Sequence, residues 1–278
     1  MSEYRIHTYT AAEAGLLVNS YLVEAADVVV LIDANLLLSD VRALAARITA
    51  LHKPLLGAFV THAHPDHFNG LPVLAGNDVP VYAAADVADT IDRIAEAKRT
   101  QWQPVYGDEW PDRHRVPDQR LSTGDVVELG GLRFTLHALG AAESHADSYL
   151  TLDDRAFIGD LAFHGTHPYT ADGHTGSWLA ALDTLAGRLA GATLYPGHGT
   201  PGDLGMLADQ RRYLMMYRET VRRLAAGAPA LTDAQRAELT DVMTRFLPGA
   251  PLTWMIGLGA DAVAAELAGE PAAETVPV

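Results

Sequence analysis

Four potential metal ligands fall within six consecutive residues of one short segment. His62, His64, Asp66 and His67 follow the pattern H-x-H-x-D-H. His62 and His64 are two residues apart, so on an extended segment their rings point to the same side. Pro65 then turns the chain, and the neighbouring side chains of Asp66 and His67 diverge. One short loop of this kind carries ligands for two metal ions.

Strand ends are expected to bring further ligands to the same place. The apolar run L-L-G-A-F-V at 55–60 is typical of a buried strand and ends just before the histidine segment. The carboxyl ends of strands are where α/β sheets usually present their chemistry. His145, Asp160 and His198 follow later predicted strands. We therefore expect all seven side chains to converge.

Composition limits both the metal and the partners. The chain has no Cys, so only His, Asp and Glu can bind a metal, which suits zinc, iron or manganese. The formal net charge of −15 works against non-specific nucleic-acid binding. No apolar run reaches the roughly 18 residues of a membrane span, and the N-terminal residues lack a signal-peptide pattern. We expect a cytoplasmic protein that acts on a small molecule, with no nucleic-acid or membrane partner.

The remaining pattern alternates strands and helices, which is typical of an α/β protein. Asp33 is expected to cap a turn, with a role beside the metal ligands as the alternative, and Ser39 or Asp40 is expected to cap a helix. Strands are predicted at 16–23, 28–33, 55–60, 79–82, 125–129, 132–136, 149–152, 155–160 and 192–195, and helices at 39–52, 71–75, 86–98, 177–188, 203–226 and 232–247.

Two stretches lack a regular period and are predicted to border the site. Long irregular segments in compact domains are usually functional or disordered. The first, 99–120, contains Trp102, Tyr106 and Trp110 and is interpreted as a flap, with simple packing on the core as the alternative. The second, 161–176, contains His164, His167 and His174. It is interpreted as a pocket wall whose histidines contact substrate, and the alternative is that these histidines make structural hydrogen bonds.

Four motifs resemble those of the metallo-β-lactamase superfamily, in the same order along the chain. They are T-H-A-H-P-D-H at 61–67, S-H-A-D-S at 144–148, G-D at 159–160 and P-G-H-G at 196–199. The resemblance runs from about residue 15 to residue 226. It implies a four-layer αβ/βα sandwich, in which two mixed β-sheets are flanked by helices and the site lies at their shared edge.

The domain plan follows from the extent of this resemblance. Residues 1–226 would form the metallo-β-lactamase-like domain, and 227–278 a C-terminal helical extension packed on it. Thr232 and Gln235 form a capping-box pattern at the start of a helix there. W-M-I at 254–256 is expected to be core, with a homodimer contact as the alternative, and 270–278 is expected to be a frayed tail.

The resemblance also implies a ligand set for two zinc ions per chain, with iron or manganese as alternatives. His62, His64 and His145 would bind one ion, and Asp66, His67 and His198 the other. Asp160 would bridge the two ions, whose separation would be about 3.5–4 Å.

The implied function is a dinuclear-zinc hydrolase that uses a metal-bridging hydroxide on a small ester, thioester or lactone. Asp66 would bind metal, orient the hydroxide and pass a proton to the leaving group. The alternatives are a small-molecule phosphodiesterase, a mononuclear-iron persulfide dioxygenase-like enzyme, and a non-catalytic metal-bound scaffold or sensor.

Several positions separate the chain from known branches of the family. Asp160 stands where true β-lactamases of this fold carry Cys or Ser. Phe163 stands where acyl-homoserine-lactone lactonases place Tyr, and His64 where flavodiiron relatives place Glu. Few basic residues follow Arg223, unlike the glutathione-binding region of glyoxalase II.

Overall fold

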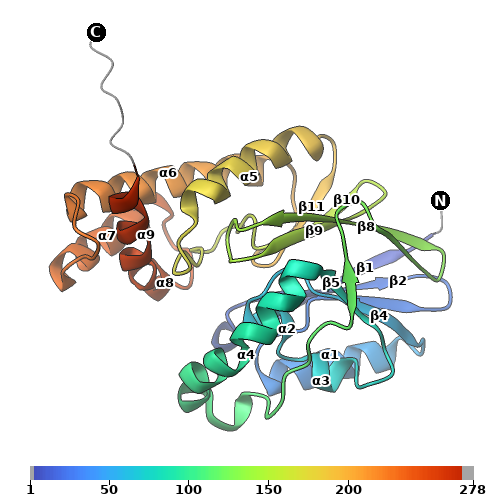
Figure 1. Ribbon diagram of the computed structural model, residues 1–278. Helices are drawn as coiled ribbons and strands as arrows, with labels where there is room; N and C mark the ends of the chain where they lie inside the picture. Colours follow the sequence, from blue (N-terminus) through green and yellow to red (C-terminus); the bar gives the residue numbers. More distant parts are fainter. Residues whose placement is uncertain (1–2, 271–278) are drawn as a thin grey trace.

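Two mixed β-sheets lie face to face in the computed structural model, which describes residues 3–270 (Figure 1). The first sheet has the order β1-β2-β3-β4-β5-β6 and the second has the order β11-β10-β9-β8-β7. The strands are β1 Arg5–Thr10, β2 Asn19–Glu24, β3 Val29–Ile32, β4 Leu55–Phe59, β5 Val81–Ala84, β6 Gln119–Leu121, β7 Val126–Leu129, β8 Leu132–Gly140, β9 Asp147–Leu152, β10 Arg155–Gly159 and β11 Thr193–Pro196.

The inner faces of the two sheets form the main hydrophobic core. All four residues of β3 are fully buried, as expected for a central strand that pairs with β2 on one side and β4 on the other. Phe134 and Leu136 of β8 and Leu150 of β9 belong to the same core from the second sheet. Because this burial removes large apolar areas from water, it fixes the spacing of the sheets and of their edges.

Helices cover both outer faces and complete the four layers (Figure 1). Helices α1, α3 and α4 cover the first sheet, while α5 and α6 cover the second. The helices are α1 Leu38–Ala50, α2 Pro65–Phe68, α3 Leu71–Leu74, α4 Ala85–Tyr106, α5 Thr175–Arg188, α6 Gly205–Ala225, α7 Asp233–Phe246, α8 Trp254–Leu258 and α9 Ala260–Gly269. The predicted sandwich of two mixed sheets flanked by helices is therefore confirmed.

Backbone contacts between the sheets tie the ligand-bearing loops together at one edge. Both the amide and the hydroxyl of Ser148 donate to the carbonyl of Thr61, over 2.9 and 2.7 Å. The amide of Asn19 donates to the carbonyl of Gly197 over 2.7 Å. These bonds join the loop after β4 to β9 and join β2 to the loop after β11, so the loops do not move independently.

Two helix predictions need correction. Helix α4 continues to Tyr106, so residues 99–106 are helical rather than irregular. Trp102, Tyr106 and Trp110 pack in succession there, with ring centroids 6.2 and 6.0 Å apart. They also pack with Leu36 and Leu37, which stabilises the end of the helix although Pro104 lies inside it. Helix α1 begins at Leu38 without a side-chain cap. Asp40 instead accepts hydrogen bonds from the Tyr9 hydroxyl and the Ala12 amide.

The C-terminal helices pack on the far part of α6. The predicted capping box is present. The backbone amide of Gln235 donates to the Thr232 hydroxyl, and the backbone amide of Thr232 donates to Oε1 of the Gln235 side chain. The Tyr217 hydroxyl of α6 donates to the carbonyl of Ile256 in α8 over 2.5 Å. Beyond Glu270, the predicted tail lies outside the described residues. Within 3–270, no helix is both long and apolar enough to cross a membrane.

Replacing Gly70 should destabilise the protein, because a Cβ atom there would lie 1.9 Å from the carbonyl oxygen of Ala34 and 2.7 Å from Val41. We expect Gly70→Ala to cost about 1–3 kcal/mol, as overpacked sites do. Gly187→Ala is the matched control, since nothing lies within 4 Å of its Cβ position. The measurement is the unfolding midpoint in urea. An unchanged midpoint for Gly70→Ala would contradict the close approach.

Candidate metal centre

The first ligand cluster joins the segment after β4 to the loop after β8. His62 Nε2 and His64 Nδ1 lie 3.2 Å apart. Glu143 Oε2 lies 3.1 Å from His64 Nδ1 and 3.7 Å from His62 Nε2. Asp160 Oδ2 completes the group at 3.9 Å from His62 Nε2. All four side chains are buried, and each directs one ligand atom at the same small volume.

The second cluster shares Asp160 with the first. His198 Nε2 lies 3.2 Å from Asp66 Oδ2 and 3.3 Å from Asp160 Oδ2. His67 Nε2 lies 3.3 Å from Asp160 Oδ1 and 3.6 Å from Asp66 Oδ2. The Asp160 carboxylate therefore stands between two groups of ligands that are each able to hold an ion.

Buried polar atoms in these clusters have no hydrogen-bond partner among the described residues. They are both carboxylate oxygens of Glu143, Nε2 of His67 and Oδ1 of Asp160. In mutational data, an unpaired buried polar atom destabilises a protein by about 1–3 kcal/mol. Bound cations would satisfy these atoms. The imidazole and carboxylate donor set fits zinc, iron or manganese.

The ring nitrogens that face away from the clusters all have partners. His67 Nδ1 lies 2.8 Å from Asp33 Oδ2, and His62 Nδ1 lies 3.1 Å from the Thr61 hydroxyl. Asp33 also accepts hydrogen bonds from the Thr61 amide and hydroxyl, each over 2.9 Å. Such partners orient ligating imidazoles and fix their tautomers. Asp33 therefore orients a residue of the cluster, which was the alternative role, and the expectation that it caps a turn is not met.

The other two histidines are held from different segments. His64 Nε2 lies 3.0 Å from Asp172 Oδ2, which comes from the irregular stretch before α5. His198 Nδ1 lies 2.9 Å from the carbonyl oxygen of Leu16. Each of the four ligand rings therefore has a hydrogen-bonding partner on one nitrogen and the cluster on the other.

Six of the seven predicted ligands lie in the two clusters, and His145 does not. Its side chain is 44% exposed, with Nδ1 2.7 Å from His174 Nε2 and Nε2 3.8 Å from Asp172 Oδ2. The Asp147 carboxylate accounts for the position of His145. It accepts hydrogen bonds from the backbone amides of Ala142 and Ser144 and so bends the loop. Glu143 thereby faces the cluster in place of His145. In the sequence, Glu143 is marked only as a carboxylate among apolar residues after a predicted strand, and this signal is weak.

Burial and charge together set the protonation of the clusters. Burial raises the pKa of Glu143 to about 8, although the nearby His64 lowers it in part. For His198, burial opposes the charged ring, but the carboxylates of Asp160 and Asp66 outweigh it and raise the pKa to about 9. Burial would raise the pKa of Asp160 as well, but His198 and His67 hold it well below its usual value.

Comparison with known proteins agrees with this geometry. Residues 14–198 match the family model described as the metallo-beta-lactamase superfamily. The chain belongs to this superfamily. Among curated proteins, none matches the sequence closely enough to be called a relative.

Two solved structures illustrate the extent of the shared superfamily fold. A metallo-beta-lactamase from Pontibacter korlensis is 23% identical, with a TM-score of 0.61, over 77% of this chain and 99% of its own. A beta-lactamase domain protein from Burkholderia ambifaria is 21% identical, with a TM-score of 0.66, over 96% of this chain and 87% of its own. The second likeness therefore extends into the C-terminal helices.

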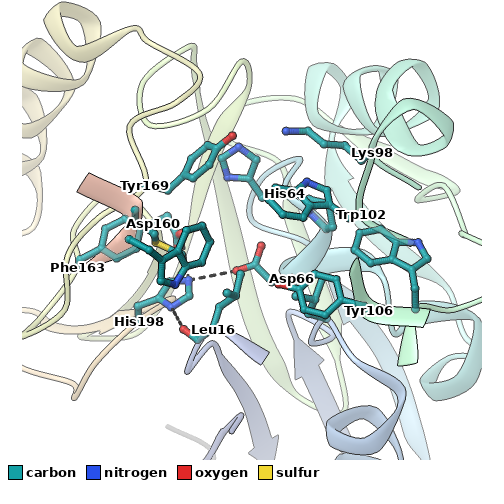
Figure 2. Close-up of a pocket in the computed structure, with 15 residues that line it drawn as sticks. Leu16, His64, Asp66, Lys98, Trp102, Tyr106, Asp160, Phe163, Tyr169 and His198 are labelled. Carbon is teal, nitrogen blue, oxygen red and sulfur yellow. Dashed lines mark hydrogen bonds and ion pairs between the residues drawn. The ribbon is translucent and has the colours of Figure 1, made fainter. Parts of the chain in front are cut away.

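A pocket opens onto the two clusters of this superfamily member (Figure 2). It is open to solvent, and its empty space is about 550 Å³ when the open mouth is included. Trp102 and Tyr106 reach it from α4, and Trp110 from the turn that follows, so all three predicted aromatics stand in its wall. The other lining residues are Leu16, Leu36, His64, Pro65, Asp66, Lys98, Asp160, Phe163, Tyr169, His198, Trp254 and Met255.

The three histidines predicted to contact substrate do not line this pocket. His164 Nδ1 lies 2.7 Å from the carbonyl oxygen of Thr200. His167 is fully buried, with Nδ1 2.9 Å from the Tyr213 hydroxyl. His174 pairs with His145, as described above. These contacts are typical of histidines that make structural hydrogen bonds, which is the alternative considered for them in the sequence. The sequence did not single out Lys98 or Tyr169, which do line the pocket.

Variants at Glu143 and His145 should separate the two ligand sets. We expect Glu143→Ala to weaken zinc binding by at least about 10–100-fold, the loss typical of an outer partner. His145→Ala should bind zinc like the unmodified protein, because the exposed ring contacts neither cluster. The measurement is chelator competition on the purified proteins. The reverse order of the two variants would restore His145 as a ligand.

Metal binding should strengthen as pH rises. His198, with a pKa of about 9, and Glu143, with a pKa of about 8, both hold protons below pH 8. A cation must displace these protons, so its apparent affinity should rise about tenfold or more per pH unit between pH 6 and pH 8. Zinc titration in buffers of different ionisation enthalpy would report the protons released. A flat affinity profile would contradict these pKa shifts.

Proposed function

We propose that this protein is a dinuclear-zinc hydrolase that acts on a small ester, thioester or lactone. The observation that carries the proposal is the shared Asp160 carboxylate. It lies 3.9 Å from His62 on one side and 3.3 Å from both His67 and His198 on the other. Two ligand groups joined by one carboxylate match the arrangement of two-metal hydrolytic sites. Membership of a superfamily that is mostly hydrolytic supports the same conclusion.

The metal centre would be held entirely by side chains already in place. His62, His64 and Glu143 would hold one ion, the cluster of Asp66, His67 and His198 would hold the other, and Asp160 would bridge them. When bound there, two zinc ions would supply a water that ionises near neutral pH and would polarise the oxygen of an acyl group.

The chain's own residues would orient the reactants and move the proton. Asp66 lines the pocket as well as the second cluster, so its carboxylate can accept a hydrogen bond from an attacking water. Burial would raise the pKa of Asp66, but His67 and His198 hold it below its usual value, so the group is an ionised acceptor at neutral pH. The same carboxylate is placed to return a proton to the leaving group.

The pocket wall favours an acyl substrate over a phosphodiester. Most of its lining side chains are apolar or aromatic, and Lys98 is the single Lys or Arg among the described lining residues. Phosphoryl groups are usually held by Arg forks or several cations. A complete second cluster also weighs against a mononuclear-iron oxygenase, which needs only one.

Metal content and a substrate panel test this proposal together. Protein purified without added metal should contain close to two zinc ions per chain and hydrolyse chromogenic esters, thioesters or lactones. His62→Ala and Asp160→Ala should each lower kcat/KM by at least about 100-fold, since ligand loss exceeds the usual cost of losing an outer partner. One iron per chain without hydrolysis would refute the proposal, and activity on phosphodiesters alone would move it to that class.

A further inference from the structure

Lys98 stands apart from the other residues that line the pocket. It comes from α4, one turn before Trp102, in a chain whose formal net charge is −15. No other Lys or Arg is found among the described residues of the pocket wall. Figure 2 shows its ammonium group on the side of the pocket that holds His64 and Tyr169. A single cation in such a wall is positioned to recognise a single anionic group.

The ammonium group is held near its neighbours without being satisfied by them. Lys98 Nζ lies 4.0 Å from Asp172 Oδ1, which is beyond hydrogen-bond range, and 5.8 Å from the centroid of the Tyr169 ring. Its side chain is only 18% exposed. An ammonium group has three donors, and Lys98 Nζ donates no hydrogen bond to any group within residues 3–270. Its donors remain free for a ligand in the pocket.

A purely structural ion pair would have a different geometry. Asp172 already serves His64 through Oδ2 at 3.0 Å, and the Tyr169 hydroxyl donates to its Oδ1 over 3.4 Å. A charge-assisted pair formed only to neutralise Asp172 would close to about 2.7–2.9 Å. The wider separation keeps the cation in place while leaving it available.

The walls around Lys98 describe the rest of the ligand. Trp102 and Tyr106 continue the same face of α4, and Trp254 and Met255 of α8 also line the pocket. Aromatic and thioether side chains of this kind hold apolar groups. A molecule that fills the pocket would therefore be apolar along its length and anionic at the part that reaches Lys98.

We propose that Lys98 is a specificity-determining residue that binds a carboxylate of the substrate. On this view, the preferred substrates are esters, thioesters or lactones whose acyl part is apolar and carries a carboxylate remote from the reacting bond. This inference rests on the proposed hydrolase function and narrows its substrate class.

A pair of esters that differ by one charge provides the first test. The 4-nitrophenyl ester of hexanoate is neutral, and the mono-4-nitrophenyl ester of hexanedioate carries a terminal carboxylate on a chain of equal length. The readout is the ratio of kcat/KM for the charged ester to kcat/KM for the neutral one. Lys98→Met should lower this ratio about tenfold or more, the value of a hydrogen bond to a charged group.

Two variants control for charge and for folding. Lys98→Arg keeps the cation and should restore most of the ratio. Arg99→Met removes the same charge from the next residue of α4, which does not line the pocket, and should leave the ratio unchanged. An unchanged ratio in Lys98→Met would overturn the proposal. Equal losses on both esters would do so as well, because they would indicate a structural role beside Asp172.

A binding measurement separates failure of this inference from failure of the proposed function. Three of the four Trp residues line the pocket, so intrinsic fluorescence reports its occupancy. We expect octane-1-sulfonate, a weak zinc ligand, to bind about tenfold less tightly to Lys98→Met than to the unmodified protein. The affinity for octan-1-ol should change far less. If no ester is hydrolysed, the hydrolase proposal fails, but this titration still decides whether Lys98 binds an anion. Equal sulfonate affinities in the two proteins would refute the role of Lys98, and so would an unmodified protein that does not bind the sulfonate.

Discussion

The Asp160 carboxylate is the interaction on which the rest of the site depends. It is 3% exposed and faces imidazoles from the segment after β4 and from the loop after β11. Two glycines make this approach possible. A Cβ atom at Gly197 would lie 1.9 Å from Asp160 Oδ1, and Gly159 has a φ of +51° directly before the carboxylate. The glycines in the G-D and P-G-H-G motifs are therefore steric requirements of the site.

The distance across the site is set by the sandwich itself. His62 and His67 follow a strand of the first sheet, whereas Asp160 and His198 follow strands of the second. The apolar core between the sheets fixes their separation, and the Ser148 bonds to Thr61 fix their relative register. Asp33 then joins the end of β3 to His67, so the ring cannot turn without breaking a buried hydrogen-bond network.

Local patterns predicted most residues of the two clusters because those residues belong to contiguous segments at strand ends. The pattern H-x-H-x-D-H and the short strand before it need no long-range information. Residue spacing does not predict that Glu143 rather than His145 faces the cluster, because this depends on a loop bend made by Asp147. The end of helix α4 is not predicted because Pro104 lies inside its last turn and usually ends a helix. Trp102 and Tyr106 pack there against Leu36, Leu37 and Trp110, and only the tertiary fold brings these residues together.

The pocket wall shows a second limit of local reasoning. Lys98 and Trp102 come from α4, Tyr169 from the stretch before α5, and Trp254 from α8, so only the tertiary fold places them around one opening. Helix α8 lies beyond residue 198, where the match to the superfamily ends, and is held by Tyr217 of α6 through Ile256. The two clusters supply four of the residues that line the pocket, and most of the others come from different parts of the chain. Changes in α4 or α8 would therefore alter the shape of the pocket while the two clusters keep their geometry.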